Sequence, residues 1–349
     1  MKTELLTVAK LDDFSKNELE KAAKIIKNGG LVVFPTETVY GLGADATNES
    51  AANKIYEAKG RPSDNPLIIH IDNPQMAEAY AYTNELYYQL AERFMPGPLT
   101  VVLKAKSTVP KATRGGLDTV AVRCPENPIA RELIKRAGVP IAAPSANLSG
   151  SPSPTNVKHV IDDMMGRVDL IIDGGDSDFG LESTIVKLDD DGGLTLLRPG
   201  KITPQDLKEV VKDVRVASAV TEELKEGETA ISPGMKYRHY APKASVVLLE
   251  GAKSACVKYI KDENLKNVAI ICYDSDFEFF SSEFDNAEIY NFGNEEKYEE
   301  QAHVLFSILR EADKRNFDKI YAPLPKTDGV GLALYNRMIR AAAYKIIRL

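Results

Sequence analysis

The 349-residue sequence has no tryptophan, only three cysteines and no long apolar run. Cys124, Cys256 and Cys272 are far apart and form no CxxC pair, which argues against a disulfide framework and a structural zinc site. No stretch approaches the roughly 20 apolar residues that span a bilayer. Acidic residues near the N-terminus argue against a signal peptide, so we expect a cytoplasmic protein without membrane contact.

The sequence also lacks an excess of positive charge. It has 44 Lys and Arg against 51 Asp and Glu, a formal net charge of -7. This balance argues against broad coating of nucleic acid but allows a local basic pocket. The length favours two domains, and the 44% hydrophobic and 27% charged residues are typical of globular proteins.

The stretch GGLVVFPTETVYGLGA (29–44) places polar residues after a predicted strand. Leu31 to Phe34 is a short apolar run bounded by Gly-Gly and Pro, which indicates a buried strand. Thr36, Glu37 and Thr38 follow it, where open α/β sheets usually bind ligands. A binding loop and a tight polar turn are both compatible with this stretch alone.

Short helices alternate with further predicted strands up to residue 200. Several of these strands end at polar loops that begin with or contain proline. The expected strands lie within residues 67–71, 95–105, 119–125, 139–154, 168–176, 183–188 and 194–200. The pattern predicts an α/β or α+β domain whose strand ends surround one cavity.

Residues 203–242 have a different composition, with a helix expected over 203–214 and then a charged, proline- and glycine-containing linker. The segment 233–242 carries aromatic and basic residues, and we expect it to close over the cavity as a lid, with Tyr237 or His239 reaching the bound ligand. Simple docking of the linker into a groove between domains is the alternative. From residue 243 the strand–helix alternation predicts a parallel, Rossmann-like sheet, without a GxGxxG phosphate motif.

Lys59 and Arg61 are the first candidates for chemistry. They flank Gly60, so both cations can converge on one anion, with Arg61 supplying a planar fork and Lys59 a point charge. For an isolated KGR sequence, a solvated charged turn is the commoner structure.

Polar residues at other predicted strand ends form a second group. Arg123 ends a short apolar strand and needs a carboxylate, either internal or from a ligand; Arg198 has the same position on a later strand. Ser145 and Asn147 can hydrogen-bond phosphate or ribose oxygens, although a plain Ser/Pro loop is the alternative. His70 by itself is more often a half-buried histidine than a catalytic one.

These motifs resemble the YrdC/Sua5 family of threonylcarbamoyl-AMP synthases. The family pattern K-x-R…S-x-N is matched by 59–61 and 145–147, and the following segments are also similar: FPTETVYGLG, KGRPSDNPL, PGPLT, VAVRCP, APSAN and LRPG. PGMKYRHYAP (233–242) and the residues after it resemble the long Sua5 branch. The resemblance implies a twisted mixed sheet with helices around a basic cavity in residues 1–202, a linker or lid in 203–242 and a smaller Rossmann-like domain in 243–349.

The resemblance further implies a nucleotidyltransferase reaction. L-Threonine, bicarbonate and ATP would give threonylcarbamoyl-AMP and pyrophosphate, the first step of t6A modification at position 37 of tRNA. The residues implied to bind threonine are Thr38, His70, Arg123, Ala143 and Ser183. Those expected to bind ATP are Arg61, Asn65, Thr119, Ser145, Ser153 and Arg198, together with Asn147 of the family pattern and Tyr237 of the lid. Lys59 and Arg61 are expected to neutralise the departing pyrophosphate.

Metal and macromolecular partners are less defined. The sequence has no dedicated carboxylate cluster, so we expect Mg²⁺ to arrive with ATP and leave its protein ligands unknown, with Glu37 and Glu182 as candidates. A separate transferase would pass the threonylcarbamoyl group to tRNA, and weak contact of this chain with tRNA is compatible with the resemblance. The alternative function is a non-catalytic RNA-binding module that uses the same basic cavity. A hydrogenase-maturation carbamoyltransferase would need cysteine-rich zinc modules, which three scattered cysteines exclude.

Overall fold

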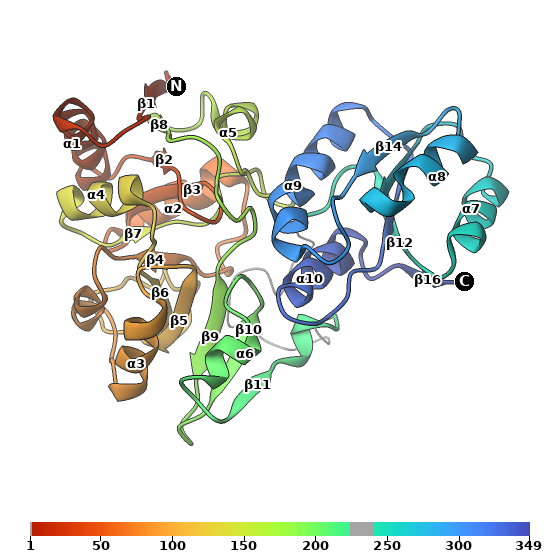
Figure 1. The fold of residues 1–349 in the computed structure, drawn as a ribbon. Helices are drawn as coiled ribbons and strands as arrows, with labels where there is room; N and C mark the ends of the chain where they lie inside the picture. Colours follow the sequence, from red (N-terminus) through yellow and green to blue (C-terminus); the bar gives the residue numbers. More distant parts are fainter. Residues whose placement is uncertain (1, 224–239) are drawn as a thin grey trace. The chain divides into compact units, whose positions relative to one another are not determined.

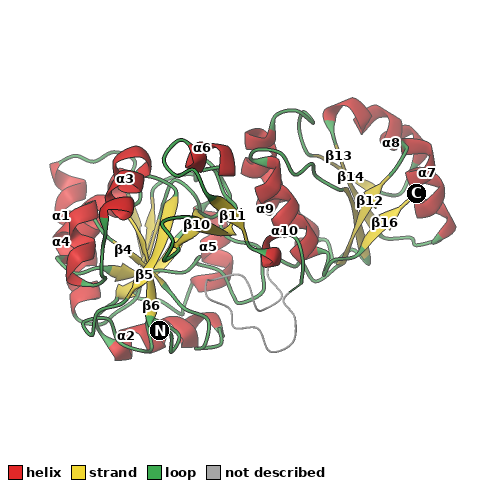
Figure 2. Ribbon diagram, turned by 90° about the horizontal axis from the view of Figure 1, so that it is seen from below, coloured by secondary structure: helices red, strands yellow, loops and turns green. Residues whose placement is uncertain are grey.

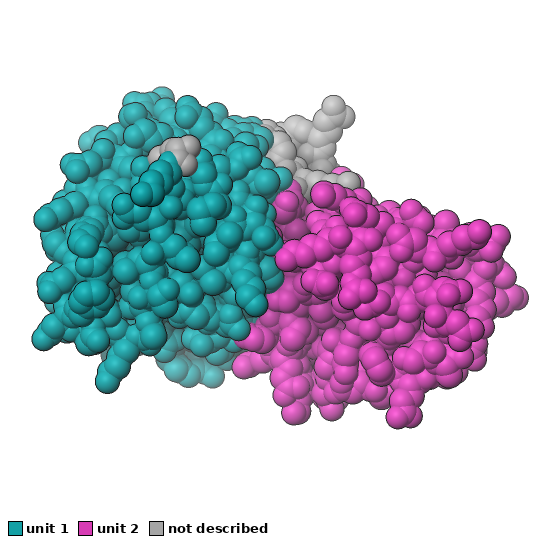
Figure 3. All heavy atoms as spheres, turned by 90° about the horizontal axis from the view of Figure 1, so that it is seen from above, with its two compact units in different colours: residues 1–149, 153–220, 224–236 teal, residues 150–152, 221–223, 237–349 magenta. Residues whose placement is uncertain are grey.

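A computed structural model describes residues 2–223 and 240–349 of the protein. These residues form two compact units, coloured separately in Figure 3. The first unit contains residues 2–149 and 153–220, and the second contains 240–349 with the short segments 150–152 and 221–223. None of the helices in the two described ranges combines the length and the apolar character needed to cross a bilayer.

The first unit is built on a mixed sheet of eleven strands (Figure 1). The strand order is β1-β8-β2-β3-β7-β4-β6-β5-β9-β10-β11. Their bounds are β1 Glu4–Thr7, β2 Val32–Phe34, β3 Gly41–Asp45, β4 Ile68–His70, β5 Leu99–Lys104, β6 Thr119–Arg123, β7 Ile141–Ala142, β8 Leu170–Asp173, β9 Thr184–Leu188, β10 Leu194–Arg198 and β11 Val214–Val216. Both parallel and antiparallel pairs occur, which confirms the predicted mixed α/β architecture.

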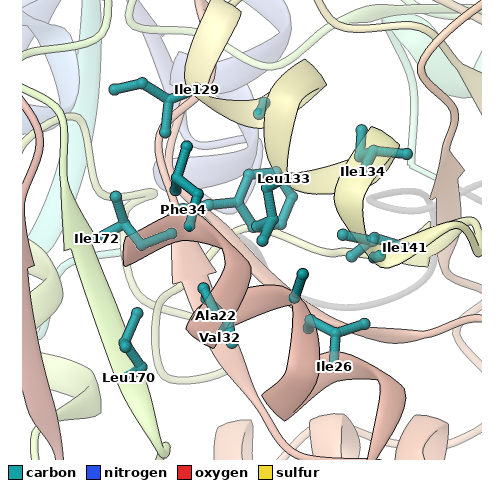
Figure 4. Packing of buried hydrophobic residues seen from close by; sticks show 14 of the residues in the cluster. Ala22, Ile26, Val32, Phe34, Ile129, Leu133, Ile134, Ile141, Leu170 and Ile172 are labelled. Carbon is teal, nitrogen blue, oxygen red and sulfur yellow. The ribbon is translucent and has the colours of Figure 1, made fainter. Parts of the chain in front are cut away.

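Six α-helices and two short 3₁₀ helices accompany this sheet in the described residues. They are α1 Asp13–Lys27, α2 Glu49–Lys59, η1 Pro74–Ala79, α3 Glu85–Phe94, α4 Pro128–Ala137, α5 Val157–Met164, α6 Pro204–Lys208 and η2 Ser218–Val220. Helices α1 and α4 bury apolar side chains at helical spacing, such as Ala22 with Ile26, against β2 and β8 (Figure 4). Each large side chain buried in this way contributes about 1.5–3 kcal/mol to folding. The core therefore fixes β2, whose end carries the predicted polar loop.

The second unit is a five-stranded parallel sheet in the order β14-β13-β15-β12-β16. Its strands are β12 Ser245–Glu250, β13 Val268–Cys272, β14 Glu288–Asn291, β15 Lys319–Pro323 and β16 Ile346–Arg348. Its helices are α7 Lys253–Asp262, η3 Asp274–Asp276, α8 Phe277–Glu283, α9 Tyr298–Lys314 and α10 Gly331–Ala341. Helices α7 and α8 cover one face, and α9 and α10 cover the other (Figures 1 and 2). The predicted parallel Rossmann-like sheet is confirmed.

The helix expected over 203–214 is wrong in its length. Helix α6 ends at Lys208, after Thr203 and Asp206 form a capping box at its start. The chain then turns, and β11 pairs in parallel with β10. The β-branched residues Val210, Val211, Val214 and Val216 lower helix propensity, and the open edge of β10 offers hydrogen bonds that a longer helix would forgo.

Candidate active site

The loop between β2 and β3 is buried and internally hydrogen-bonded. The Thr36 hydroxyl donates to the Val39 carbonyl at 2.6 Å, and its oxygen lies 2.9 Å from Thr38 Oγ1. Strand β3 can pack here because of its glycines: a Cβ on Gly43 would lie 2.7 Å from both Ile141 Cγ2 and a Phe34 ring carbon. The loop is therefore a fixed part of the core, and the predicted polar residues are held in defined positions.

Arg123 is buried at the carboxyl end of β6 and has an internal carboxylate partner. Its Nη2 donates to Glu37 Oε1 at 2.6 Å and to Thr38 Oγ1 at 2.9 Å. The side chains of Arg123 and Glu37 are only 5% and 7% exposed. Arg123 Nε has no hydrogen-bond partner in the described part of the chain, so the guanidinium keeps a donor for a ligand.

His70 pairs in register with Arg123 across β4 and β6. Its Nδ1 lies 3.3 Å from the Ile141 carbonyl, which can only accept, so Nδ1 is the protonated nitrogen. Burial, aided by the charge of Arg123, lowers the pKa of His70 to about 3. The ring is therefore neutral near pH 7, and it can hydrogen-bond a substrate without adding positive charge.

Ser183 and Arg198 lie at the same end of the sheet as Arg123, near the carboxyl end of β6. Ser183 Oγ lies 2.8 Å from Thr100 Oγ1, and Arg198 donates to the carbonyl and hydroxyl oxygens of Ser183 at 3.0 and 3.1 Å. Thr100 in turn pairs in register with Arg123. Arg198, expected at ATP, thus touches Ser183, expected at threonine, so the structure brings members of the two sets together. We call the following residues the carboxyl-end cluster, after the ends of β4 and β6: Glu37, Thr38, His70, Arg123, Ser183 and Arg198.

Lys59 is buried at the end of α2 and holds the 145–147 loop. Its Nζ donates to the Asn147 carbonyl at 2.5 Å and also to the Ser145 carbonyl. Ser145 Oγ donates to Asn147 Oδ1 at 2.5 Å. Lys59 therefore organises this loop, whose hydroxyl and amide were predicted to meet phosphate or ribose.

Arg61 lies at the amino end of β4. Its Nη2 donates to the carbonyls of Asn65 and Pro66 at 3.3 and 3.1 Å. Thr119 begins β6, four residues before Arg123, which places it about 13 Å away along the strand. We call the following residues the amino-end cluster: Lys59, Arg61, Asn65, Thr119, Ser145 and Asn147.

The segment from Ala143 to Asn147 runs along β4 between the two clusters. Ala143 N donates to the Ile68 carbonyl at 2.9 Å, beside β4, and Ser145 forms a bridge with Gly41. Ala146 N donates to the Tyr40 carbonyl at 2.8 Å. This segment therefore runs from the β4 strand toward the amino-end cluster, with Ser145 at its far end.

The carboxylates suggested as metal ligands are already engaged. Glu37 accepts from Arg123, and Glu182 Oε1 accepts from the Ser153 hydroxyl at 2.5 Å. In residues 2–223 and 240–349, no three His, Cys, Asp or Glu side chains are grouped so that they could hold a metal ion. Both candidate carboxylates therefore already have hydrogen-bond partners within the protein.

The sequence analysis did not predict the contacts of two site residues, Thr100 and Glu37. Two further residues that it proposed cannot be located, because they lie outside the described residues. Thr100 was not singled out, although a threonine inside the apolar strand LTVVL is a weak signal of a polar contact. Glu37 was considered as part of a polar binding loop and as a metal-ligand candidate, but its pairing with Arg123 was not predicted because it depends on a contact 86 residues away. Tyr237 and His239, together with most of the proposed lid, lie outside the described residues.

Comparisons with known proteins cover both units. A family model described as "Telomere recombination" (Sua5/YciO/YrdC) matches residues 24–200, and one described as "Threonylcarbamoyl-AMP synthase, C-terminal domain" matches residues 202–343. Threonylcarbamoyl-AMP synthase of Pyrococcus abyssi is 45% identical over 94% of both chains, and that of Bacillus subtilis is 41% identical over 100% of both. A crystal structure of P. abyssi Sua5 complexed with L-threonine matches with a TM-score of 0.89 and 41% identity, covering 100% of both chains.

Proposed function

The chain belongs to the Sua5/YciO/YrdC family of threonylcarbamoyl-AMP synthases, and we propose that it makes L-threonylcarbamoyl-AMP and pyrophosphate from L-threonine, bicarbonate and ATP. It is an enzyme of the nucleotidyltransferase type. The product supplies the threonylcarbamoyl group of t6A in tRNA. A separate transferase that acts on tRNA consumes it.

One observation carries the proposal: a buried arginine that is held by an internal carboxylate and still has a donor to offer. Arg123 is fixed by Glu37 and Thr38, and its Nε is unused within the described ranges. A planar guanidinium fork binds a carboxylate with defined orientation. We place the threonine carboxylate at Arg123, with Thr38 and Ser183 as hydrogen-bonding neighbours.

The nucleotide then occupies the side toward the amino-end cluster. Arg61 provides positive charge for phosphate oxygens, and the loop held by Lys59 presents Ser145 and Asn147. Arg198, in contact with Ser183, stands where the two substrates would meet. The residues present fit ATP that carries its own Mg²⁺, and this ion would supply additional neutralisation of phosphate charge.

The proposed reaction requires the protein mainly to hold threonine, bicarbonate and ATP in the correct positions. The neutral threonine amine attacks the carbon of bicarbonate with loss of water, or that of carbon dioxide derived from it with loss of a proton to solvent, and gives a carbamate. A carbamate oxygen then attacks the α-phosphate of ATP. A P–O bond forms to the carbamate, and the bond to pyrophosphate breaks. Neither step needs a covalent enzyme nucleophile. Correct alignment of bound reactants can lower such a barrier by roughly 7–11 kcal/mol, and the rigid clusters at the two ends of β4 suit this role.

The test measures pyrophosphate release from ATP with threonine and bicarbonate supplied separately and together. Release only with both substrates is the expected result, along with incorporation of labelled bicarbonate into an adenylate. Arg61→Ala should abolish turnover at an unchanged melting temperature, since Arg61 lies in a loop rather than in the core. Threonine-independent release of pyrophosphate would contradict the proposed reaction. No release with all three substrates, together with RNA binding stronger than ATP binding, would favour the non-catalytic alternative.

A further inference from the structure

The second unit contains a cavity of about 350 Å³ at the carboxyl ends of β12, β13 and β15. This volume lies within the range of small-molecule sites, which are typically about 300–1,000 Å³. The described residues expected to bind threonine or ATP all belong to the first unit. The proposed reaction therefore gives this cavity no role.

The cavity lies where the connections of two neighbouring strands diverge. Strands β12 and β15 are parallel partners. After β12 the chain enters α7 on one face of the sheet, and after β15 it enters α10 on the opposite face (Figure 1). Such divergence opens a crevice beyond the strand ends, and open α/β sheets bind their ligands at this point.

The inner wall of the cavity is apolar. Leu249 and Ile270 come from the sheet, Ile260 from α7 and Phe280 from α8, and all four belong to one core cluster. Tyr273 lies at the end of β13 and stacks on Phe292, with ring centroids 6.0 Å apart and an interplanar angle of 24°. The wall therefore favours a flat, weakly polar group.

The rim is rich in carboxylates that are already paired with bases. Asp276 pairs with Lys253, Glu250 with Arg348 at 2.8 Å, and Glu295 with Lys326 at 3.2 Å. A phosphate would meet these carboxylates and would have to displace an ion pair to bind. A hydroxyl group can donate to a carboxylate without breaking its ion pair, because each carboxylate accepts several hydrogen bonds.

The loop after β12 also lacks the features of a phosphate-binding loop. It has no GxGxxG motif, and Gly251 is explained by packing rather than by a phosphate. A Cβ at Gly251 would lie 2.7 Å from the Leu349 carbonyl oxygen, next to β16.

We propose that this cavity binds an uncharged, phosphate-free molecule of the nucleoside type, with its planar ring against the apolar wall and its hydroxyl groups at the carboxylate rim. The ring lies between α7 and the sheet, where Ile260 and Ile270 contact its faces. The hydroxyls donate to Asp276 and Glu295. The proposal does not depend on the reaction of the first unit.

Two cysteines in the cavity wall allow a local test with adenosine as the probe. All three cysteines are buried; Cys256 and Cys272 line the cavity, and Cys124 lies in the first unit. In the full-length protein, modification of each cysteine by a small neutral disulfide reagent is followed over hours by peptide mass spectrometry. Saturating adenosine should slow modification of Cys256 and Cys272 at least fivefold and leave Cys124 unchanged. AMP at the same concentration should slow it less than twofold.

A cavity-filling variant and a matched control complete the test. Leu324→Trp places an indole at the rim of the cavity, and Leu265→Trp adds the same group at an exposed leucine of the same unit that does not line it. Adenosine binding is measured by calorimetry with excess ATP present, which occupies the nucleotide site of the first unit. Binding should fall at least tenfold in Leu324→Trp and persist in Leu265→Trp.

Three outcomes would overturn the proposal. Unchanged reaction rates of Cys256 and Cys272 with adenosine would show that no nucleoside enters the cavity. Equal protection by AMP would contradict the exclusion of phosphate. Full binding by Leu324→Trp would place the adenosine elsewhere.

Discussion

Two arginines of the first unit have similar partners but opposite surroundings. Arg123 and Glu37 are 5% and 7% exposed, whereas Arg215 is 44% exposed and pairs with Asp189, Asp191 and Asp213. Water and salt screen the second group and hardly reach the first. The same ion-pair chemistry therefore fixes a binding group in one place and forms a charged surface in the other.

The position in the sheet explains this difference. Arg123 lies on the interior strand β6, whereas Arg215 lies on β11, the last strand of the sheet. Charged side chains on an edge strand hinder pairing with another chain. Arg215, whose hydrogen bonds to Asp191 and Asp213 raise its pKa, is charged at all relevant pH values and suits this protective role.

Removing the negative charge beside Arg123 should have the largest effect. Glu37→Gln keeps the shape of the side chain but leaves a buried guanidinium without a counter-ion, which costs about 3 kcal/mol or more. Urea unfolding should show this loss of stability. The control Asp213→Asn makes the same chemical change in the exposed cluster, and a loss of similar size there would contradict the contrast between the two regions.

Arg123→Lys should have the next largest effect, seen in binding rather than in folding. Lysine keeps the charge beside Glu37 but loses the planar fork, so affinity for threonine should fall roughly ten- to a hundredfold, or about 1.4–2.7 kcal/mol. Affinity for ATP should change less than threefold. Calorimetry with each ligand separately measures both values, and equal losses would make Arg123 a structural residue only.

The strands that place these side chains were largely readable from the sequence. Short apolar runs bounded by glycine or proline predicted β2, β4 and β6, and polar residues after them marked the site. Strand β3 was missed because two glycines in GLGAD suggest a loop, although close packing on Phe34 and Ile141 requires a glycine at Gly43. Strands β11 and β16 were missed because each is a partly exposed strand at the edge of its sheet, without a run of buried apolar residues to mark it.

Side-chain partnerships were harder to predict than positions. The sequence indicated that Arg123 needs a carboxylate but left open whether a ligand or the protein supplies it. The answer depends on how the 36–40 loop packs against β6, which no local pattern encodes. In the same way, Lys59 matched a family motif, but its bonds to the 145–147 loop required the fold.

His70 should contribute little near neutral pH, and its effect on stability should appear as a pH dependence below about pH 6.5. Its pKa is lowered to about 3 in the folded protein, against about 6.5 when unfolded. Between these values the unfolded chain binds a proton that the folded chain does not, so stability falls as pH is lowered from 6.5 toward 3. The slope is up to about 1.4 kcal/mol per pH unit. Urea unfolding from pH 7 to 4 should show a shallower slope for His70→Gln, whereas parallel curves would contradict a neutral buried His70.

The smallest effect is expected for Arg215→Ala, and it should depend on salt. The substitution removes the cation that three aspartates share, and Lys187 remains 3.9 Å from Asp189 alone, so repulsion among the aspartates destabilises the folded state. At 0.15 M salt the Debye length is about 8 Å, and most of this repulsion is screened. The urea midpoint of Arg215→Ala should therefore match that of the unmodified protein at 0.15 M NaCl and fall below it at 10 mM.

Glu37→Gln provides the matched comparison, because its charge imbalance is buried beyond the reach of mobile ions. Its loss of stability should be nearly the same at both salt concentrations. The two variants thus separate burial from ion-pair chemistry in one experiment. A salt-independent loss in Arg215→Ala would mean that its side chain stabilises β11 by packing, through its aliphatic stem, rather than by charge.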